Sequence, residues 1–77
     1  MTEYTLKYRE ARKIPTEQYG NIDIEESGEV TSTVLGTDLE MDFALMKARK
    51  VANLDAREAT IRGIVAELEA KRLRGGT

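Results

Sequence analysis

The sequence predicts an α+β fold, in which an antiparallel β-hairpin of two or three strands is followed by one long amphipathic helix. Two observations carry this prediction. Residues 37–74 repeat their apolar side chains with helical period. Residues 2–35 alternate apolar and polar side chains instead, and turn-forming residues interrupt the alternation. With 77 residues, the chain is expected to form a single domain that ends in a flexible tail at 75–77.

The predicted helix carries large apolar side chains on one face. They are Leu39, Phe43, Met46, Leu54, Ile61, Ile64, Val65 and Leu68, and only Lys50 and Arg57 interrupt them. Thr37 and Glu40 have the spacing of a capping box, and Gly75 stands where a left-handed residue commonly ends a helix. A break at 53–55 is the alternative to a single helix, but the apolar face stays in phase across it.

The predicted hairpin has strands over 2–14 and 22–35. Tyr4, Leu6 and Tyr8 share one face of the first strand, where the alternation weakens after residue 10, so residues 10–13 are expected beyond the covered core. Residues 15–21 form the turn. In the second strand Ile22, Ile24, Val30 and Val34 have the same parity. Gly28 predicts either a bulge or a second turn, which would make a third strand.

Composition argues against an enzyme. The chain has no cysteine and no histidine, so it lacks thiolate nucleophiles, the usual general base and the commonest metal ligand. No cofactor and no metal site are expected. The net charge of −2 selects no class of partner, and the absence of long apolar runs predicts a cytoplasmic protein without a membrane segment.

The length of the helix predicts a homodimer. A straight helix over 37–74 would be about 55 Å long, whereas a compact globule of this size is roughly 30 Å across. Either the helix breaks and folds back, or a second chain covers the excess length. Two hairpins joined into one four-stranded sheet would be one such arrangement. The second helical face would suit close helix packing, and its candidate interface residues are Met41, Leu45, Ala48, Ala52, Ala59 and Ala66.

Two charged sets on the hairpin are candidate binding surfaces. Lys7, Arg9, Arg12 and Lys13 could follow the phosphates of a nucleic acid. Asp23, Glu25, Glu26 and Glu29 could meet a basic protein partner. Pairing of opposite charges across the two strands explains both sets without any ligand.

Two short stretches resemble known proteins. Arg72-Leu73-Arg74-Gly75-Gly76, with Thr77 after it, resembles the tail of ubiquitin and implies a modifier, although the order strand, strand, helix leaves no final strand before the tail. Lys13-Ile14-Pro15-Thr16-Glu17-Gln18-Tyr19-Gly20-Asn21-Ile22-Asp23-Ile24-Glu25 is similar to small phage-encoded proteins with a hairpin and one helix. That similarity implies an accessory protein of a mobile element, which acts on a host protein or complex and could inhibit a defence system.

Overall fold

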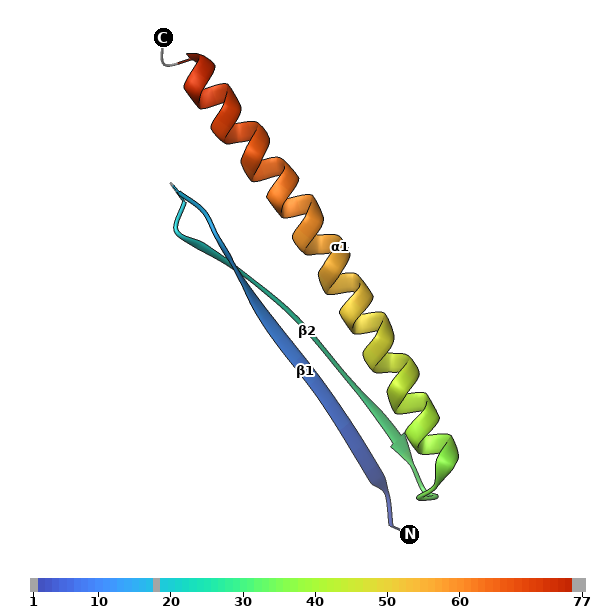
Figure 1. Cartoon of the computed structure of the whole chain (residues 1–77). Helices are drawn as coiled ribbons and strands as arrows, with labels where there is room; N and C mark the ends of the chain where they lie inside the picture. The colour runs from blue at the N-terminus through green and yellow to red at the C-terminus, as the bar shows by residue number, and fades with distance from the viewer. Residues whose placement is uncertain (1, 18, 76–77) are drawn as a thin grey trace.

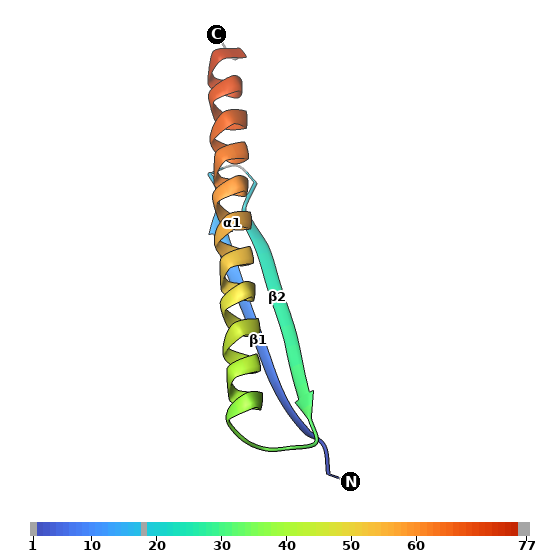
Figure 2. The same cartoon turned by 90° about the vertical axis from the view of Figure 1, so that its right-hand side faces the viewer.

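The computed structural model describes residues 2–17 and 19–75. Strand β1 (Tyr4–Pro15) pairs antiparallel with β2 (Asn21–Ser32), and helix α1 (Thr37–Gly75) runs back along one face of this sheet (Figure 1). The two views agree that the helix lies beside the hairpin along its whole length and continues past it (Figures 1 and 2). The α+β prediction is confirmed, with two strands in the sheet.

The molecule is a rod. Its extents are 68 × 17 × 12 Å and its radius of gyration is 18.7 Å, well above the roughly 11–12 Å expected for a compact chain of this length. The helix is continuous through 53–55, so the alternative of a broken helix is wrong. Because one layer of two strands lies on one helix, each element keeps a large part of its surface exposed.

Strand register sorts the side chains by parity. The pairing runs without interruption from Tyr4 opposite Ser32 to Pro15 opposite Asn21, so even-numbered residues lie opposite even-numbered ones. Even positions of both strands are buried or half-buried under the helix, and odd positions are exposed. The face that begins with Tyr4, Leu6 and Tyr8 therefore continues to Ile14, which is 1% exposed. The expectation that residues 10–13 lie beyond the covered core is wrong, because polar side chains occupy the middle of the covered face.

Gly28 is neither a bulge nor a turn, so those predictions are wrong. It lies opposite Tyr8 in an unbroken ladder. A Cβ built on Gly28 would lie 2.8 Å from Met46 Sδ and 3.1 Å from Lys50 Cε. Glycine is needed here because the helix passes close to the strand, and not because the backbone turns.

The hairpin turn lies between Pro15 and Asn21, which are paired in the ladder, so it is one residue shorter at each end than predicted. Gly20 has φ of 69°, a conformation that glycine adopts without a steric penalty. Thr16 closes the turn, because its backbone N–H and its hydroxyl both donate to the Gly20 carbonyl, at 3.0 and 2.6 Å. At the other end, β2 stops at Ser32, before Val34. Val34 and Leu35 lie in the exposed connection to the helix, and the predicted inward position of Val34 is wrong.

Both helix ends differ slightly from prediction. The Glu40 N–H donates to the Gly36 carbonyl at 3.2 Å, which places the N-cap at Gly36 rather than at Thr37. The helix also includes Gly75, whereas the prediction placed a left-handed cap there. The rest of the expected flexible tail, residues 76–77, lies outside the described residues.

The buried core is small and lies in the half of the sheet nearest the turn. Ile14, Ile24 and Leu54 form it, and Ile22 and Ile61 pack against it. Leu39 is buried separately near the start of the helix. Farther along α1, Ile64 and Leu68 are 52% and 45% exposed, although the sequence places them on the same face as Leu54. Val65, which lies between them in the chain, is half-buried and lines a hollow with Ile14 and Thr16, so the hairpin end covers one flank of this part of α1 and leaves Ile64 and Leu68 exposed on the other.

Candidate functional site

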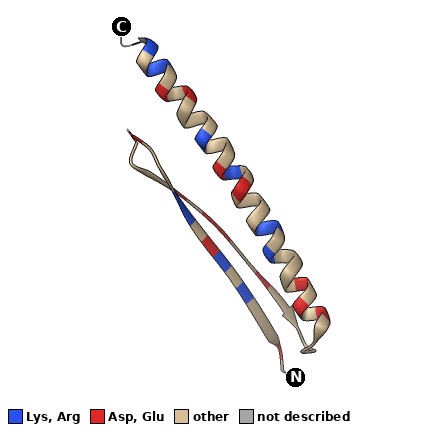
Figure 3. Cartoon of the chain, viewed as in Figure 1, with Lys and Arg blue, Asp and Glu red and all other residues tan. Residues whose placement is uncertain are grey.

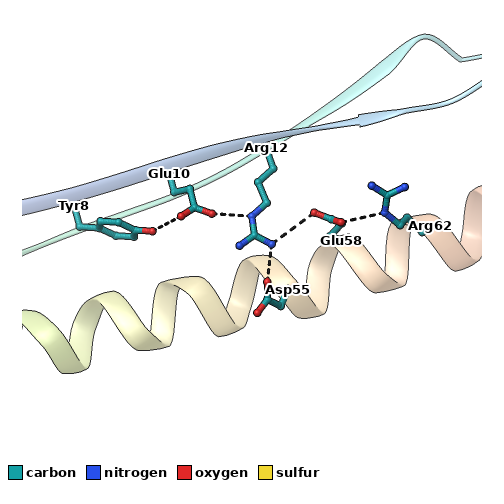
Figure 4. A network of polar contacts seen from close by, with 6 residues as sticks. All are labelled: Tyr8, Glu10, Arg12, Asp55, Glu58 and Arg62. Carbon is teal, nitrogen blue, oxygen red and sulfur yellow. Dashed lines mark hydrogen bonds and ion pairs between the residues drawn. The ribbon is translucent and has the colours of Figure 1, made fainter.

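A polar network centred on Arg12 joins the middle of β1 to the helix (Figure 4). Tyr8 Oη donates to Glu10 Oε1 at 2.5 Å, and Arg12 Nε donates to Glu10 Oε2 at 2.7 Å. Arg12 Nη1 then crosses to the helix, where it donates to Asp55 Oδ1 at 2.6 Å and lies 3.6 Å from Glu58 Oε1. Arg12 thus holds one carboxylate of the sheet and two of the helix.

These contacts shift three ionisation equilibria. The hydrogen bond from Tyr8, and then that from Arg12, lower the pKa of Glu10 from its ordinary value. The same Tyr8 bond raises the pKa of Tyr8, because the phenol must keep its proton in order to donate. The bonds to Asp55 and then to Glu10 raise the pKa of Arg12. All three shifts favour the protonation states that hold the network together at neutral pH.

A second polar network surrounds Glu26 on the neighbouring strand. Arg57 Nη1 donates to Glu26 Oε2 at 2.9 Å and to the Glu25 carbonyl at 3.1 Å. Asn53 Nδ2 donates to Glu26 Oε1 at 3.2 Å, and Lys50 Nζ lies 3.8 Å from the same oxygen. Lys50 and Arg57, which interrupt the apolar face in the sequence, therefore pair with Glu26 across the interface between helix and sheet.

The two networks fix the position of the helix along the sheet. Glu10 and Glu26 are direct partners in the ladder, on the side that faces the helix. Two carboxylates so placed repel each other unless cations lie beside them. Arg12 supplies one cation, and Arg57 with Lys50 supplies the others. A shift of α1 by one helical turn would separate these charges, so the networks have a structural role.

The structure divides the predicted charged sets between two faces. Arg12 and Glu26 face the helix. Arg12 was missed because the buried alternation was ended at residue 10, although it continues the parity of Tyr8. Glu26 was missed although it has the parity of Ile22 and Ile24. The remaining candidates, Lys7, Arg9, Lys13, Asp23, Glu25 and Glu29, lie on the exposed outer face of the hairpin.

Charges on that outer face are balanced. Lys7 lies opposite Glu29 and Lys13 lies opposite Asp23 in the ladder. Arg9 Nε is 2.8 Å from Glu25 Oε1. Each predicted phosphate-binding side chain on this face thus has a carboxylate beside it, so the face presents no concentrated positive charge to a polyanion.

Apolar side chains are exposed in two separate places on α1. We call Ile64 and Leu68, two exposed side chains at the edge of the sheet-facing side beside the end of the hairpin, the overhang. The opposite side of the helix carries the predicted interface residues, and we call this set the outer stripe: Met41, Leu45, Ala48, Ala52, Ala59 and Ala66. All six are exposed, with Met41 and Leu45 at 58% each.

An open groove of about 600 Å³ lies between β2 and the first half of α1, and its lining mixes Val30, Met46 and Leu45 with Asp42 and Arg49. Among residues 2–17 and 19–75, no group of acidic side chains is placed to hold a metal ion. In the same part of the chain, no helix is both long and apolar enough to cross a membrane.

Comparison with family models, curated proteins and solved structures found no match to this chain.

Proposed function

We propose that this protein is a non-catalytic binding protein that acts on a partner protein. One observation carries the proposal. The large apolar side chains that are exposed outnumber the four that are buried, and two pairs of them are neighbours four residues apart on α1, Met41 with Leu45 and Ile64 with Leu68. Contiguous apolar surface of this kind commonly marks a site of protein–protein contact. A single layer of two strands on one helix supports binding better than catalysis, because it encloses no site from water.

The overhang is the surface that best fits a partner protein. Ile64 and Leu68 are continuous with the face of α1 that packs on the hairpin, so they extend an interface that already excludes water. Lys71, Arg72 and Arg74 follow them at the end of the helix (Figure 3). This arrangement fits a partner with an apolar patch bordered by carboxylates, since apolar contact would supply affinity and the charges would orient the two proteins.

The biological setting follows from the resemblance of residues 13–25 to phage-encoded proteins. It supports an accessory protein of a phage or mobile element, which acts in the host cytoplasm on a host protein or complex. Inhibition of a defence system is the corresponding activity. A second copy of the chain is also part of the proposal, and it uses a different surface of the helix.

Affinity capture from a bacterial lysate tests the proposal. The tagged chain is compared with Ile64→Glu combined with Leu68→Glu, each with and without nuclease. We expect the unmodified chain to retain a defined protein after nuclease treatment, and the overhang variant to lose it. Val34→Glu combined with Leu35→Glu is the matched control, because it places the same charges on exposed apolar positions at the other end of the rod.

Two results would overturn the proposal. If no protein is retained, partner binding is wrong. If retention disappears with nuclease, the nucleic-acid alternative is correct. In that case Lys7→Ala with Arg9→Ala should abolish salt-sensitive binding while circular dichroism shows an unchanged fold.

A further inference from the structure

The outer stripe is longer than its predicted members indicate. Ala56, Gly63 and Ala70 are also exposed and continue the same intervals of three or four residues, so the complete stripe runs from Met41 to Ala70. It lies on the side of α1 that faces away from the hairpin. Within residues 2–17 and 19–75 all its members stay exposed, although Leu45 and Ala66 also line grooves that they share with the hairpin.

Packing among the described residues does not require a glycine at position 63. A Cβ built on Gly63 would have no atom within 4 Å, in contrast to Gly28, where a Cβ would meet Met46 at 2.8 Å. Glycine is a much poorer helix former than alanine, and this position lies inside a 39-residue helix. A close approach by something outside the chain would account for the missing side chain.

Side-chain size along the stripe indicates which way a second helix would run. The large members, Met41 and Leu45, are at the start, and the small members, Gly63, Ala66 and Ala70, are at the end. An antiparallel copy brings large residues against small ones and keeps the two axes at an even separation. A parallel copy would set Met41 against Met41 and Gly63 against Gly63, so the axes would diverge at one end and leave a gap at the other.

Charge along the helix favours the same direction. Its first turns carry Asp38 and Asp42, and its last turns carry Lys71 and Arg74 (Figure 3). These residues lie on the same flank of the outer stripe, by helical period. In an antiparallel pair centred between residues 55 and 56, Asp42 meets Lys71 of the second copy and Asp38 meets Arg74, each within one helical turn. In a parallel pair these residues of the two copies would lie on opposite flanks of the interface, so the pairing of acidic with basic ends would be lost.

We propose that a second copy of this chain packs antiparallel on the outer stripe, with a two-fold axis near Ala56. In this register Leu45 lies opposite Ala66 of the second copy, and Ala48 lies opposite Gly63. The inference deepens the proposed function by naming one partner. It leaves the overhang of each copy exposed for the host protein, so the two proposals use separate surfaces and can fail separately.

Solution mass is the first test. Light scattering at micromolar concentration should give twice the 8.6 kDa of one chain. Ala52→Glu combined with Ala59→Glu should reduce the mass to that of one chain while the helical circular dichroism signal persists, because both positions are exposed within the single chain. Ala11→Glu, an exposed alanine on the outer face of β1, is the matched control and should remain dimeric.

Cross-linking tests the direction. The chain has no cysteine, so each introduced thiol reports alone. Under mild oxidation, Ala56→Cys should form a covalent dimer with itself. A mixture of Leu45→Cys and a tagged Ala66→Cys should form the mixed dimer in at least ten-fold excess over either self-dimer. Ala11→Cys should remain monomeric on a denaturing gel.

Three results would overturn the inference. A monomeric mass would exclude the dimer, without bearing on capture of a host protein by the overhang. Self-dimers of Leu45→Cys and of Ala66→Cys, without the mixed species, would show a parallel pair. Efficient cross-linking through Ala11→Cys would show that the copies meet at the hairpin instead.

Discussion

Gly28→Ala tests the closest approach between the helix and the hairpin. The added Cβ would lie 2.8 Å from Met46 Sδ and 3.1 Å from Lys50 Cε. Optimal separations of non-bonded carbons are about 3.5–4.0 Å, so these side chains must move or the helix must shift away from β2.

The expected cost follows from two opposing effects. Overpacking an interface by a methyl group costs about 1–3 kcal/mol, and the flexibility of methionine places this site in the lower part of that range. Replacing glycine by alanine restricts the unfolded chain, which returns about 0.4–1 kcal/mol. We expect a net loss of about 1 kcal/mol in the free energy of unfolding, which lowers the urea midpoint by about 0.5–1 M.

Equilibrium urea unfolding at one fixed protein concentration measures this loss. Fixing the concentration matters because any association contributes to apparent stability. The matched background is Met46→Ala, which removes the nearest of the atoms that the new Cβ would meet and leaves only Lys50 Cε, near the end of a flexible side chain, at 3.1 Å. There, Gly28→Ala should be neutral or stabilising. If Gly28→Ala raises stability in the original background, or destabilises both backgrounds equally, the close approach does not explain the glycine.

The remaining predictions concern the core and the polar networks. Leu54→Ala should remove about 2–5 kcal/mol, a large part of the roughly 4–11 kcal/mol expected for a chain of this length, and thermal unfolding should show a much lower midpoint. Arg12→Leu should lower the urea midpoint more than Arg9→Leu, because it leaves three carboxylates without their shared cation, whereas Arg9 is exposed and has one partner. The lowered pKa of Glu10 stabilises the folded state above the pKa of the unfolded chain, so this contribution should disappear as the pH falls below the ordinary value of 4.5 and through the lowered folded-state pKa. The raised pKa of Tyr8 predicts the opposite dependence at high pH. Its contribution to stability should be lost as the pH rises above the ordinary value of 10.0 and through the raised folded-state pKa. Urea midpoints measured across pH should therefore lose part of their acid dependence in Glu10→Gln and part of their alkaline dependence in Tyr8→Phe. If either variant keeps the full pH dependence of the original chain, that residue does not contribute as described.

The periodic segments of the fold were predictable from the sequence, and the packing between them was not. Helical period and the turn at Gly20 identify the elements, because local preferences determine both. The role of Gly28 depends on Met46, a residue eighteen positions away in the chain, and no local pattern contains that contact. Sequence reasoning therefore assigned the glycine to a backbone feature.

The charged interior of the interface was the larger error. Arg12 and Glu26 look like exposed residues when each strand is considered alone. Their inward positions are stabilised by Asp55 and Arg57 on the helix, so only the assembled fold makes them compatible with burial. The candidate surfaces were predicted in part. The outer stripe is exposed, as its spacing indicates. The charged sets lie on two faces of the hairpin, and the prediction missed this because it did not follow the strand parity to Arg12 and Glu26.

The outer face of the hairpin also limits how its edges can pair. Both strands have one edge without a strand beside it, and such edges invite other strands to add. On the exposed side, the charged residues of β1 are all basic (Lys7, Arg9 and Lys13), and the charged residues of β2 are all acidic. Pairing β1 with β1 of another copy, or β2 with β2, would therefore align like charges.

Only the head-to-tail pairing of β1 with β2 is electrostatically favourable, and it generates an open ribbon rather than a closed pair. The charge pattern therefore opposes a four-stranded dimer. It also defines the route by which the chain would form fibres if its helix were lost.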